Sequence, residues 1–135
     1  MRGYYNDDYS ITILYEHVDN KSLHSLLHDA KDTKNALSDK MKGKFVTQIA
    51  AALQTLHSQN LVHGHLTSAN VLLDKEFDVK LADCGLPSLK KYVSVKTGYS
   101  IMDASIPPEY MSDTAKYINM TEPSADIYSF GFLLW

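Results

Sequence analysis

Two polar motifs that enclose a pair of short apolar runs constrain this chain more than any other feature of its sequence. The first motif, His-Gly-His-Leu-Thr-Ser-Ala-Asn at residues 63–70, precedes the apolar run 71–73. The second motif, Asp-Cys-Gly at residues 83–85, follows the apolar run 79–81. Short apolar runs on either side of a polar turn predict a β-hairpin. Asn70 and Asp83 then stand at the two ends of this hairpin, so an amide and a carboxylate are able to converge on one ion.

The residues before these motifs predict a long amphipathic helix. Apolar side chains recur at intervals of four and three residues between about 38 and 58, which is the spacing of one helical face. Ser38 or Asp39 is suited to cap its start, and Asn60 is suited to end it in a left-handed conformation. The apolar face comprises Met41, Phe45, Ile49, Leu53 and Leu56, widened by Val46 and Ala52. We expect this face to pack against a core.

Other segments are assigned from composition and spacing. β-Branched and aromatic residues predict a strand at about 10–16, and leucines at helical spacing predict a short helix beginning near Leu23. Residues 86–106 show no period and predict a long irregular segment of the kind that often carries function. The apolar stretch 124–135 predicts the start of a buried helix, capped by Ser124.

Charge and cysteine content limit the classes of partner. The chain has 13 basic and 16 acidic residues and a formal net charge of −3, with no extended basic run, so nucleic acid is not an implied partner. No apolar run reaches the roughly 18 residues of a membrane span, so we expect no membrane segment within this sequence. Cys84 is the single cysteine, which suits a reducing compartment such as the cytoplasm.

The motifs together resemble those of eukaryotic protein kinases. The motif at 63–70 is similar to the catalytic loop, Asp83 and the glycine two residues later to the metal-binding turn, 107–109 to the end of the activation segment and 124–131 to the anchoring helix. The resemblance implies an α+β, protein-kinase-like fold with a mainly helical C-lobe, a hinge strand, a catalytic-loop β-hairpin and an incomplete N-lobe.

The same resemblance implies how the domain is organised. Residues 1–135 would form one partial kinase-like domain, with the hinge at about 15–20 and the C-lobe over 21–135. The hinge sequence at 15–23 is similar to that of tyrosine-kinase-like and receptor-like kinases. The catalytic-loop form is similar to that of inactive receptor-like kinases and of the kinase-homology region in membrane guanylate cyclases. This branch implies a location in the cytoplasm or in the cytoplasmic part of a membrane receptor.

The resemblance also assigns a nucleotide site. Asn70 and Asp83 are implied as ligands of Mg²⁺, which prefers carboxylate and carbonyl oxygens. Glu16 and Val18 are implied as the hinge positions whose backbone meets the adenine of ATP, and Leu72 would lie beneath the base. ATP and Mg²⁺ are therefore the expected cofactors.

His65 departs from the family pattern at the decisive position. It stands where an active kinase carries its catalytic aspartate, and Thr67 stands where serine/threonine kinases usually carry a lysine. An imidazole accepts protons, but it is bulkier than a carboxylate and has one acceptor nitrogen, so it would not orient a hydroxyl in the same place. Losing a general base typically lowers a rate by about 10²- to 10⁴-fold.

These observations favour a pseudokinase that binds ATP and Mg²⁺ and acts in signalling as a regulatory or scaffold module, with other signalling proteins or a second kinase domain as partners. One alternative is an active serine/threonine or dual-specificity kinase that phosphorylates proteins, with His65 as a substitute base. A second is an interaction module that binds no nucleotide. A third is a truncated gene product.

Overall fold

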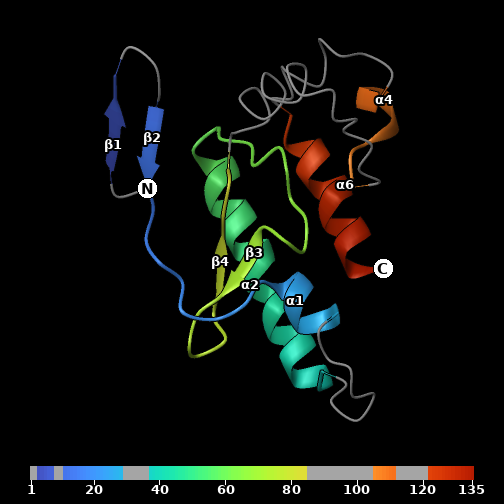
Figure 1. Ribbon diagram of the computed structural model, residues 1–135. Coiled ribbons are helices and arrows are strands. Elements are labelled where there is room, and N and C mark those ends of the chain that lie inside the picture. The colour runs from blue at the N-terminus through green and yellow to red at the C-terminus, as the bar shows by residue number, and fades with distance from the viewer. Residues whose placement is uncertain (1–2, 8–10, 29–36, 85–104, 112–121) are drawn as a thin grey trace.

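The computed structural model describes residues 3–7, 11–28, 37–84, 105–111 and 122–135. Its elements follow in the order β1 (Gly3–Asn6), β2 (Ile11–Leu14), α1 (Leu23–His28), α2 (Asp39–Ser58), β3 (Val71–Leu73), β4 (Val79–Leu81), α4 (Pro108–Met111) and α6 (Pro123–Leu134). Figure 1 shows the small sheets and the helices in one α+β arrangement, as expected from the sequence.

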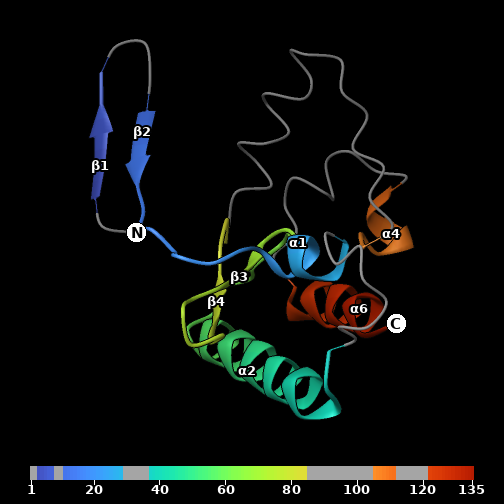
Figure 2. The same cartoon turned by 60° about the horizontal axis from the view of Figure 1, so that its bottom comes forward.

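Strands β1 and β2 form an antiparallel hairpin in which Gly3 pairs with Leu14 and Asn6 with Ile11. Figures 1 and 2 both show this hairpin standing apart from the helical body. The expected strand at about 10–16 is confirmed over Ile11–Leu14. Strand β1 was not predicted from the sequence, because Gly-Tyr-Tyr-Asn is too short to show an alternation of apolar and polar residues.

Helix α2 has the bounds that the apolar spacing predicted. The Oγ of Ser38 accepts a hydrogen bond from the backbone N of Met41 at 3.3 Å, which is the role of an N-cap residue. Asn60, just beyond the helix, has a φ of 57° and occupies the left-handed region. Both ends of α2 are therefore determined by local side-chain and backbone chemistry.

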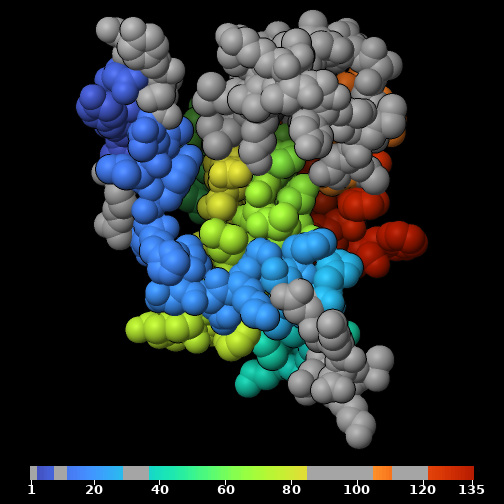
Figure 3. All heavy atoms as spheres, in the orientation of Figure 1, coloured from blue at the N-terminus to red at the C-terminus, as the bar shows by residue number. Residues whose placement is uncertain are grey.

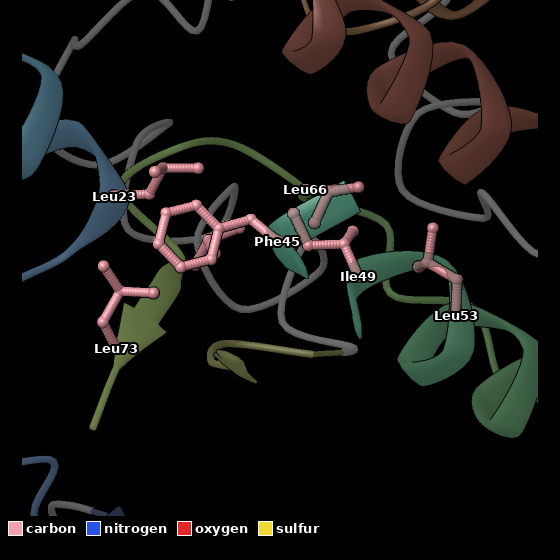
Figure 4. Packing of buried hydrophobic residues seen from close by; sticks show 7 residues of the cluster. Leu23, Phe45, Ile49, Leu53, Leu66 and Leu73 are labelled. Carbon is pink, nitrogen blue, oxygen red and sulfur yellow. The ribbon is translucent and has the colours of Figure 1, made fainter. Parts of the chain in front are cut away.

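The core forms where α2 meets α1, β3 and the loop before β3. Figure 4 shows the labelled side chains pointing toward one another from these elements. Burial of each such side chain contributes roughly 1.5–3 kcal/mol to folding. The buried cluster comprises Leu23, Phe45, Ile49, Leu53, Leu66, Val71 and Leu73.

Strands β3 and β4 pair antiparallel, with Val71 opposite Leu81 and Leu73 opposite Val79. The hairpin predicted from the two apolar runs is therefore confirmed. Gln48 of α2 binds it directly, because its Oε1 accepts from Val79 N at 3.0 Å and its Nε2 donates to Asp78 Oδ1 at 2.7 Å. Helix α2 thus supports the hairpin as well as the core.

The chain between β2 and α1 runs along the outer side of β3. Ser22 forms an antiparallel bridge with Leu72, and the backbone N of Leu73 donates to the carbonyl of Lys21 at 3.1 Å. In the space-filling view the blue residues of this stretch and of α1 lie next to the yellow-green hairpin (Figure 3). The expected short helix beginning near Leu23 is confirmed as α1.

The start of α6 corrects one prediction. The helix begins at Pro123 and its N-cap is Glu122, so Ser124 lies in the first turn and is not the cap. Proline at the first helical position has a φ that already fits the helix and lacks an N–H that would need a partner, which moves the start one residue earlier. Residues 85–104, most of the predicted irregular segment 86–106, lie outside the described residues.

None of the helices within the described residues combines the length and the apolar character that crossing a membrane requires.

Candidate functional site

Asp126 of α6 holds the loop that precedes β3. Its carboxylate is 1% exposed and accepts hydrogen bonds from the backbone N of His63 and of Gly64, each at 2.8 Å. The Nε2 of His57, at the end of α2, lies 2.8 Å from the same carboxylate. Gly64 has a φ of 74°, a backbone conformation that favours glycine. A buried charge on one helix therefore determines the path of a loop far away in sequence.

His63 is a buried part of this loop rather than a reacting group. Its side chain is fully buried, and its Nδ1 accepts a hydrogen bond from the backbone N of His65 at 3.2 Å. Burial lowers the pKa of His63, and Asp126 opposes that effect. The imidazole is therefore held neutral, as suits a packing residue.

His65 and Asn70 contact each other at the end of the loop. The Nδ2 of Asn70 donates to the backbone carbonyl of His65 at 2.7 Å and lies 2.8 Å from His65 Nδ1. A backbone carbonyl can only accept a hydrogen bond, so the Asn70 atom that contacts it must be the amide nitrogen, a donor. The same nitrogen contacts Nδ1 of His65, so Nδ1 must be an acceptor. In a neutral imidazole the proton then resides on Nε2. The Nε2 of His65 is then a donor and not an acceptor.

The hairpin brings the position of Asn70 next to that of Asp83. Val71 pairs with Leu81, and the backbone N of Ala82 donates to the carbonyl of Asn70 at 2.9 Å, which continues the ladder by one step. Asp83 follows at once with a φ of 60°, so the chain turns sharply there. The two residues expected to share one ion therefore lie on adjacent strand ends.

The donor atoms at these strand ends suit Mg²⁺. The two hydrogen bonds from the Asn70 side chain to His65 use Nδ2 and not the Oδ1 carbonyl, and Asp83 carries a half-buried carboxylate, so the oxygens that Mg²⁺ prefers are present. The described residues include no group of three or more histidine, cysteine or acidic side chains that could hold a metal. Mg²⁺ needs no such group, because it commonly keeps water and takes phosphate oxygens as further ligands.

The residues expected to contact adenine lie in the segment between β2 and α1 and on β3. Glu16 is exposed, and its Oε1 lies 3.5 Å from Lys80 Nζ of β4. Val18 and Leu72 are half-buried. Because Ser22 bridges to Leu72, the end of the hinge and β3 lie side by side.

A cleft of about 370 Å³ lies between α1 and α6 and is bordered by residues 66–69 of the loop before β3. Its lining includes His24, Leu27, Ser68 and Phe132. Ser129 of α6 borders it and donates to the carbonyl of Ser105 at 2.7 Å, which fastens the segment before α4 to α6. Sequence reasoning missed Ser129 and the contact of His57 with Asp126. Ser129 is a polar residue within a mainly apolar helix, and this could have indicated from the sequence that its hydroxyl has a buried partner.

The comparisons with known proteins agree with this arrangement. The family model described as protein tyrosine and serine/threonine kinase matches residues 1–135. The chain is 31% identical over 93% of its length to the serine/threonine-protein kinase CTR1 of Arabidopsis thaliana. It is 31% identical over 92% of its length to the "leaf rust 10 disease-resistance locus receptor-like protein kinase-like 1.2" of the same plant. It is 29% identical over 93% of its length to the dual specificity protein kinase shkB of Dictyostelium discoideum.

The match covers 15% of CTR1 and 19% of each of the other two, so the chain spans less than a fifth of the length of these curated relatives. The described elements correspond to part of a kinase domain. This chain belongs to the protein tyrosine and serine/threonine kinase family. The family in general uses ATP and Mg²⁺.

Proposed function

We propose that this chain is part of a pseudokinase domain that binds ATP with Mg²⁺ and transfers phosphate poorly or not at all. The contact between Asn70 Nδ2 and His65 Nδ1, at 2.8 Å, carries the proposal. It favours the imidazole tautomer whose second nitrogen donates, whereas activation of a substrate hydroxyl needs an acceptor. The sequence adds Thr67 in place of a lysine, so a second charged group is absent.

Phosphoryl transfer depends on positioning and on electrostatic stabilisation, and these two replacements weaken both. We expect a rate at least about 10²-fold below that of a comparable kinase, from the missing general base. The test is a phosphorylation assay on the full-length protein with His65, with His65→Asp and with His65→Ala. We expect background transfer from the parent protein and a higher rate from His65→Asp. Transfer by the parent that His65→Ala abolishes would refute the proposal.

Retention of nucleotide is the second half of the proposal. Asn70 and Asp83 would hold Mg²⁺, the backbone at Glu16 and Val18 would meet the adenine, and Leu72 would lie beneath the base. A ligand that binds only the native state raises the melting temperature. We expect ATP with Mg²⁺ to raise it for the parent protein and not for Asp83→Ala. Asp39→Ala, an exposed change on α2, is the matched control and should keep the shift.

The role would then be regulatory or structural in signalling, with another signalling protein or a second kinase domain as partner. The chain has a single cysteine, Cys84, which is free and exposed, and such sparse cysteine use suits a cytoplasmic site or the cytoplasmic part of a receptor. A melting temperature that millimolar ATP and Mg²⁺ leave unchanged would instead support a module that binds no nucleotide.

An active serine/threonine or dual-specificity kinase is the second candidate, and the names of two relatives, CTR1 and shkB, favour it. In that case His65 would have to turn away from Asn70 to offer a nitrogen lone pair to the substrate. Such a kinase would show transfer that is lost in Asp83→Ala as well as in His65→Ala. The same assay therefore separates the two candidates.

A further inference from the structure

Two histidines outside this site lie together on α1. His24 and His28 are four residues apart, and side chains at this spacing share one face of a helix. Their ring centroids are 4.4 Å apart, the ring planes are inclined by 44°, and both residues are exposed. Two imidazoles are thus within reach of a common point at the surface.

A neighbouring hydroxyl orients the first of the two rings. The Nδ1 of His24 lies 3.4 Å from the Oγ of Ser68, and the backbone N of His24 donates to the carbonyl of Ser68 at 2.9 Å. When Nδ1 carries the proton and donates to this hydroxyl, the lone pair lies on Nε2. Metal-binding histidines commonly donate their second N–H in this way, which fixes the tautomer that binds the ion.

We propose that His24 and His28 form a two-nitrogen site for a transition-metal ion, Cu²⁺, Ni²⁺ or Zn²⁺. Imidazole suits these ions, and paired histidines at i and i+4 on a helix are a known zinc-binding arrangement. Metal–nitrogen bonds would be about 2.0–2.1 Å, so both tilted rings would have to rotate until one nitrogen of each faces the ion. The described residues provide no cluster of three such ligands, so water completes the coordination shell. Cu²⁺ should bind most tightly of the three.

The site is joined to the loop that carries His65 and Asn70. Ser68 belongs to that loop and contacts His24 through both its backbone and its side chain. An ion on α1 would therefore restrict the end of the loop and one wall of the cleft that His24 lines. The proposal does not depend on nucleotide binding, because its ligands are separate from Asn70 and Asp83.

The test is a Cu²⁺ titration of the full-length protein without a histidine tag, in excess Mg²⁺, followed by electron paramagnetic resonance and calorimetry. We expect a bound ion whose spectrum shows imidazole nitrogen. His24→Gln and His28→Gln should each weaken binding at least about tenfold, and Ser68→Ala on the order of 10-fold, as for loss of a group that orients a ligand. His17→Gln, an exposed histidine beside Asp19, is the control and should bind as the parent does.

Three results would overturn the proposal: equal binding by the parent and both glutamine variants, loss of binding in His17→Gln instead, or a bound-copper spectrum without imidazole nitrogen. A parent spectrum without imidazole nitrogen refutes the proposal without any variant, whereas a spectrum with it is assigned to His24 and His28 by the glutamine variants, because the chain has four other histidines. Circular dichroism of each variant verifies that the helical content is unchanged.

Discussion

At the scale of single residues, Asp126 organises the candidate site. One buried carboxylate receives the backbone N–H of two successive loop residues and the ring of His57, and bonds to an ionised acceptor are about twice as strong as neutral ones. The loop so fixed brings His65 against Asn70. The chemistry of the site therefore depends on a residue that has no reacting role.

Replacing Asp126 with alanine should destabilise the protein strongly. The change leaves the buried N–H groups of His63 and Gly64 without their acceptor, and each unsatisfied buried group costs about 1–3 kcal/mol. We expect a loss on the order of 2–5 kcal/mol in the free energy of unfolding, measured by urea denaturation. Asp39→Ala, which removes an exposed carboxylate, should change it by less than about 1 kcal/mol. Similar losses for the two variants would contradict this account.

The pKa of His63 predicts a dependence of stability on pH. Burial lowers this pKa below the usual value of about 6.5, so below that pH the unfolded chain takes up a proton that the folded chain still excludes. The contribution of neutral His63 to the free energy of unfolding is complete above about pH 6.5, and it decreases as the pH falls toward the pKa of His63 in the folded protein. When the pH falls from 7.5 to 5.5, the free energy of unfolding measured by urea denaturation should decrease less for His63→Gln than for the parent. His17→Gln is the exposed control, and equal losses in all three proteins would refute the assignment.

At the scale of elements, α2 joins the core to the hairpin. Its buried face contributes Phe45, Ile49 and Leu53 to the core, and Gln48 hydrogen-bonds to the hairpin at Asp78 and Val79. These contacts hold β3 and β4 in the register that places Asn70 beside Ala82. The helix therefore helps to position the candidate metal ligands.

Phe45→Ala should be among the most destabilising changes in α2. The ring is buried within the core cluster, and deletion of a buried phenylalanine costs about 3–5 kcal/mol through lost burial and the cavity left behind. Thermal and urea unfolding measure the loss. Thr47→Ala, on the exposed side of the same helix, should change stability by about 0.5 kcal/mol or less. A small effect of Phe45→Ala would mean that α2 does not pack as described.

At the scale of the whole molecule, apolar surface gathers on the β1–β2 hairpin and on α6. Tyr4 is 70% exposed and Ile127 of α6 is 56% exposed, and a two-stranded hairpin alone is only marginally stable in water. Both regions, blue and red in Figure 1, lie at the edges of the described fold. Exposed apolar residues that gather in this way favour association with another protein surface.

The chain Met1–Trp135 expressed by itself should therefore self-associate as its concentration rises. Ile127→Lys combined with Leu134→Lys places charge on the exposed face of α6 and should shift the population toward monomer. Light scattering after size-exclusion chromatography measures the mass. Thr47→Lys, on the exposed side of α2, is the matched control and should leave the association unchanged. Monomer at all concentrations in the parent chain would contradict the prediction.

Local features of the sequence predicted several elements correctly. The bounds of α2 follow from a cap at Ser38, an apolar face of regular spacing and a left-handed Asn60, and the β3–β4 hairpin follows from two short apolar runs. Strand β1 and the start of α6 were not predicted, because the strand is short and the choice between Glu122 and Ser124 as cap depends on Pro123.

The sequence by itself determined the family, the positions of Asn70 and Asp83 on one hairpin and the absence of a carboxylate at residue 65, because motifs and spacing are local properties. The tertiary structure alone decided the hydrogen-bonding role of His65. That role depends on the amide of Asn70, which reaches the ring only because Asp126, 61 residues after His65, holds the loop in place. Donor and acceptor roles follow from contacts between distant residues, which local spacing does not specify.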